Sequence, residues 1–403
     1  MVRTAIHPPG LAAAGFAATA IGYGPARMGF GLFVPEFRES FGLSSATVGY
    51  VSSLGFLGFF LGLLAAQAML PRRGPSGPVL LGLGAAAAGM AAVAAAPNVP
   101  VLALGVFLAT SSAGFTWTPF NDAVHRRVPE PARPGALSKV STGTGVGIAS
   151  AGLAALVVTL GGGSWRLAWA AFAVAAVVSF ALNHAALRGV ERDPGHGPAE
   201  WRALLDRAAI PLFVIAFAYG ATSAIYLSFA ADRLTAAGGV PGLPVAATPA
   251  ILFVCYGLVG LAGLATNRVR DAIGLPPLVR LLMLAGATSA ALVALAPGGW
   301  AALTLSAGLQ GLHVMMTSAV LAFWSDRLFP TLPALSFTAA LLATAAGSVL
   351  GPAVAGTALD ALGPRATFLG TAALPAGVAL VLRARHTRER PAGTAGPPSA
   401  ASR

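Results

Sequence analysis

The sequence predicts an all-α membrane protein in which twelve transmembrane helices form two six-helix bundles. Of its 403 residues, 56% are hydrophobic and only 9% are charged, whereas soluble proteins are about 25% charged. Long apolar runs recur along the chain, and a helix needs ~20 such residues to cross a bilayer core of ~30 Å. The longest internal polar segment, residues 188–207, divides these runs six and six. Lipid is therefore the expected solvent for most of the surface.

Twelve apolar runs pass this length test. Strands of a membrane barrel would be only ~10 residues long and would alternate in polarity, so the run length favours helices. Several connections are short and rich in proline or glycine, as at 97–100, 161–163 and 297–299. The expected spans are 10–34, 46–69, 78–96, 101–121, 140–163, 166–187, 209–231, 246–266, 278–296, 300–324, 332–358 and 366–382.

The same pattern divides the chain into four regions. Residues 1–187 are expected to form the N-terminal bundle and residues 208–382 the C-terminal bundle, with a cytoplasmic linker at 188–207 between them. Residues 383–403 are polar and rich in proline, glycine and serine. Such a composition cannot bury enough apolar surface to fold, so we expect a disordered cytoplasmic tail.

The basic residues predict the orientation of the chain in the cell (inner or plasma) membrane. An even number of spans puts both termini on one face. Most of the 25 lysines and arginines lie at the termini and in the even-numbered loops, and Arg38, Arg166, Arg233 and Arg365 lie on the other face. Positive loops stay in the cytoplasm, so both termini are expected there. This asymmetry also accounts for the net charge of +12 without a nucleic-acid partner.

Arg27 is the strongest candidate for a functional residue. It lies well inside the first span, directly after Gly24 and Pro25. A guanidinium stays charged in proteins, so at membrane depth it needs a partner, water or a bound anion. Two interpretations stay open: Arg27 anchors an anionic substrate, or it is a structural arginine that binds carbonyls near Pro25. Phe30, one turn further on, is expected to share the site.

The other candidates for substrate binding are polar or aromatic residues inside later spans. Gln310 and His313 lie in the middle of the tenth span, and His313 is the mid-membrane group whose ordinary pKa is nearest neutrality. It is a candidate for coupling to protons, although a histidine that bonds a neighbouring helix is the simpler explanation. Packing and cavity-facing roles are equally open for Tyr226. The remaining candidates are Trp117 and Asn121 in the fourth span.

Asp122 follows at the end of the fourth span. A pair with His125 or Arg126 is favoured there over a proton relay. No span carries a carboxylate at mid-depth, so coupling through aspartate or glutamate is not visible in the sequence.

A weak internal repeat relates the two halves. Placing Tyr23-Gly24 on Tyr219-Gly220 aligns Phe30 with Tyr226 and Glu36 with Asp232, and it sets Arg27 opposite Ser223. Such a two-fold relation is expected of a transporter built from two similar bundles.

The eleventh span carries a recognisable pattern. It reads Gly347-x-x-x-Gly351-Pro352-x-x-x-Gly356, followed by Asp360. Glycines at this spacing let helix backbones approach closely. The pattern resembles the corresponding helix of the major facilitator superfamily. The sequence WRLAW at 165–169 is also common there, and the stretch 22–62 is similar to the YbfB/YjiJ-like branch of that superfamily.

The resemblance implies a secondary transporter that works by alternating access, with gating loops on the cytoplasmic face. The superfamily's loop signature GxxxDRxGRR is only partly present. Arg72 and Gly74 fit it, but Pro71 stands where the acid is expected. The second copy of the signature retains Asn267 and Arg268. The candidates for coupling or gating are therefore Asp122, Arg72, Gly74, Asn267, Arg268, Gly351 and Pro352.

The function predicted from these features is secondary active transport of a small organic solute, an anion being one option. One alternative is a proton-coupled drug or metabolite exporter of the same fold. The other is a membrane enzyme that acts on lipid-linked substrates. No GxxxxGK[ST] loop is present, and Cys255 is the single cysteine. We therefore expect no cofactor, no metal site and no enzymatic activity, and we expect a monomer in the lipid bilayer.

Overall fold

A computed structural model describes residues 10–188, 190, 206–329 and 332–382, which contain helices and no strand. The N-terminal half comprises α1 (Gly10–Tyr23), α2 (Pro25–Leu32), α3 (Val34–Phe41), α4 (Ser45–Arg73), α5 (Ser76–Ala95), α6 (Val99–Gly114), α7 (Trp117–Arg127), η1 (Glu130–Ala132), α8 (Arg133–Leu160) and α9 (Trp165–Ala186). The C-terminal half comprises η3 (Arg207–Ala209), α10 (Ile210–Ala236), η4 (Val245–Ala247), α11 (Thr248–Gly260), η5 (Leu261–Ala265), α12 (Thr266–Ile273), α13 (Leu275–Leu295), α14 (Trp300–Leu328) and α15 (Pro333–Val381).

Ten helices in the described residues are long and apolar enough to cross a membrane. Two features reconcile this number with the twelve predicted spans. The first span is divided into α1 and α2, each too short to cross alone, and α3 follows it. Conversely, α15 contains the eleventh and twelfth spans, which meet at a kink where Gly363 has a φ of 78°. The chain is thus a multi-pass, all-helical membrane protein.

The expectation of a single continuous first span was wrong in detail. Pro25 and Pro35 stand in the first turns of α2 and α3. A proline has no backbone N–H to donate and its ring crowds the preceding turn, so helices restart at these points. The break at Gly24 is also a close contact, because an added Cβ would lie 2.6 Å from the Gly147 carbonyl oxygen of α8.

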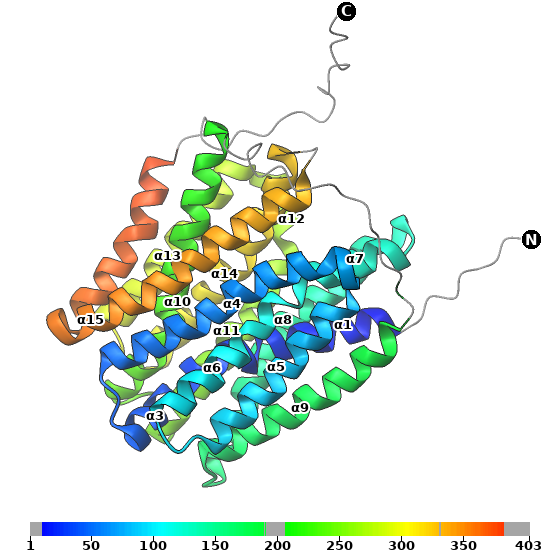
Figure 1. Ribbon diagram of the computed structural model, residues 1–403. Coiled ribbons are helices and arrows are strands. Elements are labelled where there is room, and N and C mark those ends of the chain that lie inside the picture. The colour runs from blue at the N-terminus through cyan, green and yellow to red at the C-terminus, as the bar shows by residue number, and fades with distance from the viewer. Residues whose placement is uncertain (1–9, 189, 191–205, 330–331, 383–403) are drawn as a thin grey trace, which may run out of the picture.

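The helices form two groups that lie side by side (Figure 1). Within the N-terminal group, α1 packs on α8 and α9, and α6 packs on α4 and α5. Within the C-terminal group, α15 packs on α10 and α13, and α14 packs on α11. The most extensive contacts between the groups join α4 with α15 and α8 with α11. The predicted linker 188–207 lies largely, and the tail 383–403 entirely, outside the described residues.

The two bundles meet most closely through glycines. We call the face with Gly10 and Leu382 the terminal face and the other one the opposite face. An added Cβ on Gly152 would lie 2.8 Å from the Ala250 carbonyl oxygen, and one on Gly31 would overlap the Leu227 carbonyl oxygen. Helices in lipid gain little from the hydrophobic effect when they associate, so close backbone packing of this kind stabilises their contact instead. We call these inter-bundle contacts, together with the contact of Gly49 and Pro352, the glycine seams.

Gly31→Ala tests the α2–α10 contact. We expect the added methyl group to push α2 away from Leu227 and to expose the region beyond Arg27. In a Cys255→Ser background, a cysteine placed at buried Ser52 should then react faster with a maleimide. Gly370→Ala is the matched control, because no atom lies within 4 Å of its added Cβ. Unchanged labelling in the Gly31→Ala protein would contradict the importance of this seam.

Candidate functional site

A cavity of about 200 Å³ lies between the two bundles. Its walls come from α1, α2, α4, α7 and α8 of the N-terminal bundle and from α10, α11, η5, α14 and α15 of the C-terminal bundle. The lining residues of α14 lie in its C-terminal half, and those of α15 lie near its N-terminal end. Both of these segments are close to the terminal face. The cavity therefore extends from the middle of the protein toward that face. Its described lining includes Tyr23, Arg27, Phe59, Trp117, Tyr219 and Thr344.

Arg27 lies among aromatic rings, at the end of the cavity that is deepest in the protein. Its guanidinium carbon is 4.4 Å from the ring centre of Phe59, 5.5 Å from that of Tyr23 and 5.7 Å from that of Phe56. Each such cation–π contact contributes roughly 0.5–2 kcal/mol. Removing a charge from water costs several kcal/mol, so the rings alone do not balance the guanidinium.

The described residues provide Arg27 with no ion-pair partner. The ion pairs in that part of the chain use Arg38, Arg126 and Arg270 instead. The Nε of Arg27 is buried and has no hydrogen-bond partner. The structural alternative required bonds to carbonyls near Pro25, and the described carbonyls accept none from this side chain. Arg27 thus presents an uncompensated positive charge to the cavity.

Trp117 lines the cavity together with Arg27, but the next candidates on α7 do not. Asp122 forms an ion pair with Arg126, with 2.6 Å between Oδ2 and Nε. A second contact joins Arg126 Nη2 to Asp122 Oδ1 at 2.8 Å. The Oδ1 of Asn121 is buried without a hydrogen-bond partner.

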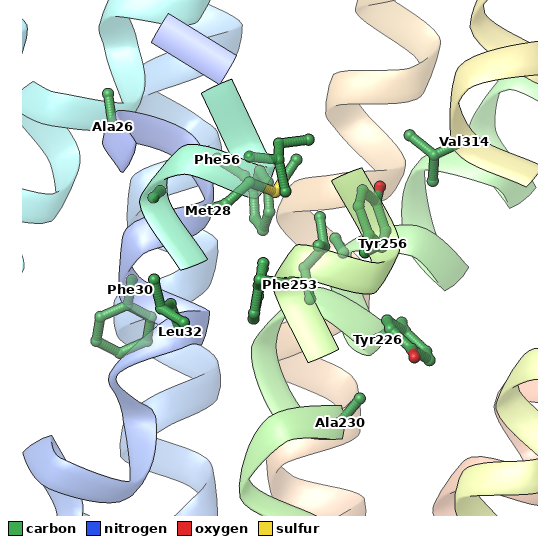
Figure 2. Close-up of a cluster of buried hydrophobic side chains, with 14 of the residues drawn as sticks. Ala26, Met28, Phe30, Leu32, Phe56, Tyr226, Ala230, Phe253, Tyr256 and Val314 are labelled. Carbon is green, nitrogen blue, oxygen red and sulfur yellow. The ribbon is translucent and has the colours of Figure 1, made fainter. Parts of the chain in front are cut away.

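Phe30 and Tyr226, which the internal repeat aligns, lie away from the cavity. Figure 2 shows them on opposite sides of the buried cluster, with Phe56 beside Met28. Phe30 stacks on Phe37 with 5.5 Å between ring centres. The hydroxyl of Tyr226 lies 2.9 Å from Ser306 Oγ on α14. Each ring therefore packs within its own bundle in this conformation.

His313 and Gln310 are also buried inside the C-terminal bundle. The Nδ1 of His313 lies 2.7 Å from the Leu282 carbonyl oxygen of α13. Its ring lies edge-on to Tyr219 at 5.5 Å. The Nε2 of Gln310 is buried and has no partner. Neither side chain lines the cavity, and Tyr219 separates His313 from it.

The predicted gating residues lie in two places. Arg72, Asn267 and Arg268 are exposed on the terminal face, where Gly74 ends α4 with a φ of 64°. On α15, Gly351 packs against Ala221 of α10, and the Pro352 carbonyl faces Gly49 of α4 in a glycine seam. Gln67, where the superfamily signature has a glycine, donates a 3.0 Å hydrogen bond to Thr338 of the other bundle.

Several cavity residues were missed from the sequence, chiefly Tyr23, Phe59 and Tyr219. One signal did point to the two tyrosines, because the Tyr-Gly pair recurs at 23 and 219 and both rings line the cavity. Nothing in the sequence distinguishes Phe59 from the other apolar residues of its helix. Ser223, aligned with Arg27, is buried and is not among the lining residues.

A polar network joins the bundles on the opposite face. Arg38 Nε lies 3.0 Å from Asp232 Oδ2 of α10, and Nη2 donates to Ser45 Oγ at 2.9 Å. The backbone N–H groups of Ser45 and Ala46 donate to Asp360 of α15 at 3.2 and 2.9 Å. Each bundle is thus tied to the other at two points, on the face away from the cavity. We call these contacts the opposite-face network.

Burial influences two acids in this region. Burial is the main reason that the pKa of Glu36 is raised to about 7. The backbone N–H of Glu36 lowers this pKa by a smaller amount, and the nearby charge of Glu39 raises it. Burial also raises the pKa of Asp232, although neighbouring Arg38 acts in the opposite direction. The exposed Asp360 differs, because the N–H bond from Ala46 lowers its pKa.

Two six-helix bundles around a central cavity define the architecture of a secondary transporter. The sequence agrees, since residues 16–331 match the Major Facilitator Superfamily. This chain belongs to that superfamily and is a membrane transporter.

Solved structures of the same fold include several transporters. The chain superposes with a TM-score of 0.75 on nucleoside transporter NupG, at 15% identity, covering 92% of this chain and 98% of that one. For a bacterial homologue of the human lysosomal transporter Spinster the TM-score is 0.73 at 17% identity, with 94% and 97% covered. For a peptide transporter, POT, it is 0.76 at 16% identity, with 93% of each covered. Among curated proteins, none matches the chain in sequence.

Glu36→Gln tests the titration on the opposite face. Glu36 has a higher pKa in the folded protein than its ordinary value of 4.5. The folded protein therefore favours the protonated carboxyl group of Glu36. The contribution of Glu36 to the free energy of unfolding declines as pH rises from about 5 to about 8. We expect the thermal midpoint of the wild type to fall over this range by more than that of Glu36→Gln.

Glu130→Gln, which changes an exposed acid in η1, should keep the pH dependence of the wild type. Parallel midpoint curves for the wild type and Glu36→Gln would show that Glu36 does not titrate in this range.

Proposed function

We propose that this protein transports a small organic anion across the cell membrane by alternating access, with Arg27 binding the charge. The observation that carries the proposal is the unpaired guanidinium at the inner end of a cavity between two bundles. Arg27 is half-buried, and a cation that is partly removed from water is stabilised by a nearby counter-charge. A substrate anion would supply the missing charge. Trp117 and Tyr219 would form the walls beside it.

The proposal assigns the terminal face to the cytoplasm. The excess of arginine on that face supports this orientation, because positively charged loops stay inside. The conformation described would then be open inward, with the glycine seams and the opposite-face network holding the outer side together. Transport would require these contacts to break while the cavity closes on its terminal side.

The remaining roles follow from position. Arg72, Gly74, Asn267 and Arg268 would act at the inner mouth, where the bundles approach during closure. Gly351 and Pro352 would act through helix packing at the outer side. We assign no substrate contact to Phe30, Asn121, Tyr226, Gln310 or His313 in this conformation. We further propose that the protein acts as a monomer and belongs to the YbfB/YjiJ-like branch, on the strength of its first two spans.

Arg27→Gln tests the anion site. We expect it to insert and fold normally but to bind and transport the anion at least about tenfold more weakly, because a charge-assisted hydrogen bond contributes roughly 1.5–3 kcal/mol. The measurement is uptake of labelled organic anions into proteoliposomes, together with ligand-induced shifts of the thermal midpoint. Measuring uptake in proteoliposomes of both protein orientations shows the direction of transport. Repeating it with and without a pH gradient shows whether transport is coupled to protons.

Arg73→Gln is the matched control, because it removes one exposed arginine of the terminal face. It should transport like the wild type. Undiminished anion transport by Arg27→Gln would refute the proposed site.

A further inference from the structure

The cavity wall carries a single charge. Arg27 is the one ionised side chain among the described lining residues, and none of them is aspartate, glutamate, lysine or histidine. A ligand with one negative charge would leave the site neutral. A dianion would bring an extra charge into a region of low dielectric, where an unpaired charge is costly. Phosphate monoesters carry about −1.5 to −2 near pH 7, so the wall disfavours them.

The hydroxyl groups of the wall give little further help to an anion, because most already donate within the protein. Ser141 donates to the Leu137 carbonyl at 2.9 Å, and Thr142 to that of Ser138 at 2.8 Å. Thr344 donates to Ala340 at 3.0 Å, and Tyr219 to Val314 at 3.2 Å. These hydrogens are committed to backbone carbonyls. A second anionic group elsewhere in the cavity would have to rely on the hydroxyls of Tyr23, Thr144 and Ser318 and on the indole N–H of Trp117.

The guanidinium of Arg27 has hydrogen-bonding capacity that the described residues do not use. The ring of Phe59 lies over the guanidinium group, with Tyr23 and Phe56 nearby. The Nε–H has no acceptor among the described residues. A guanidinium presents its N–H groups in planar pairs that match the two oxygens of a carboxylate. Rings over its face and unused N–H groups in its plane together favour a planar head group.

The rest of the wall is apolar and unusually aromatic. Phe, Trp and Tyr make up 8% of the chain, yet five line the cavity: Tyr23, Phe59, Trp117, Tyr219 and Phe337. Aromatic pairs gain roughly 0.5–1.5 kcal/mol beyond the burial of their area. The volume of about 200 Å³ lies below the roughly 300–1,000 Å³ of pockets for drug-sized ligands. The space suits a single ring.

We propose that the substrate is an aromatic monocarboxylate with one ring, held by its carboxylate on Arg27 and by its ring against Phe59 and the other aromatic side chains. This inference rests on the proposed function and narrows it. It requires one charge, a planar head group and an aromatic body, and each requirement can be tested separately with simple probes.

The experiment measures binding to the full-length protein in nanodiscs, by calorimetry and by shifts of the thermal midpoint. The probes are benzoate, benzamide, cyclohexanecarboxylate, phthalate and phenyl phosphate. We expect benzoate to bind best. Phthalate and phenyl phosphate should bind at least about tenfold more weakly because of the second charge, and benzamide should not bind measurably. Cyclohexanecarboxylate should bind several-fold more weakly than benzoate.

Two variants make the assignment specific. Phe59→Leu should reduce the preference for benzoate over cyclohexanecarboxylate while leaving the preference for benzoate over benzamide. Arg27→Lys keeps the charge but not the planar pairs of N–H groups, so it should weaken benzoate binding without restoring phthalate. Because Arg27→Lys can be checked for folding by its thermal midpoint, loss of binding is separable from loss of structure.

Each other outcome has a definite meaning. Equal binding of phthalate and benzoate would overturn the single charge, and equal binding of cyclohexanecarboxylate would overturn the aromatic body. No binding of any probe by folded protein would overturn the inference as a whole. The proposed function would survive that result if another organic anion showed transport that depends on Arg27. Equal binding of benzamide and benzoate would instead refute the anion site itself.

Discussion

The close approach of the two bundles through their glycines is the constraint on which the rest of the structure depends. In lipid, helices gain little from hydrophobic burial against one another, so close packing must hold the bundles together. Gly31, Gly49 and Gly152 permit backbone contact on the side toward the opposite face. Contact on one side leaves space on the other, and that space is the cavity. The site thus arises from where the small residues lie.

Arg27 takes its properties from the same arrangement. It precedes Gly31 by one turn, so its side chain lies just before the point where α2 touches α10. Beyond it, α2 packs closely on α10 at Gly31, and toward the terminal face the cavity remains. The guanidinium therefore stands at the boundary between packed protein and open space. The aromatic rings of Tyr23, Phe56 and Phe59 partly stabilise it there, and its Nε has no hydrogen-bond partner among the described residues.

Composition and run length were sufficient to predict the fold, because lipid imposes a fixed helix length on apolar segments. They were also sufficient to find Arg27, since a charge in an apolar run is conspicuous. Composition and run length did not predict which side of a helix faces the cavity. His313 and Gln310 lie on α14, a helix buried on most of its circumference, so polarity alone does not tell which side chain faces a cavity. Phe59 was invisible for the same reason, whereas the breaks at Gly24 and Phe33 follow from Pro25 and Pro35, which the sequence shows.

Asp360 joins two kinds of interaction that respond differently to the surroundings. It binds the first N–H groups of α4, where the helix dipole favours a negative charge. It is also exposed, so dissolved ions screen this attraction over about 10 Å at 0.1 M salt. The adjoining contact of Gly49 with Pro352 is backbone packing and is indifferent to salt. The ionic strength of the medium at the opposite face therefore weakens the Asp360 part of the contact between α4 and α15 and leaves the packing part unchanged.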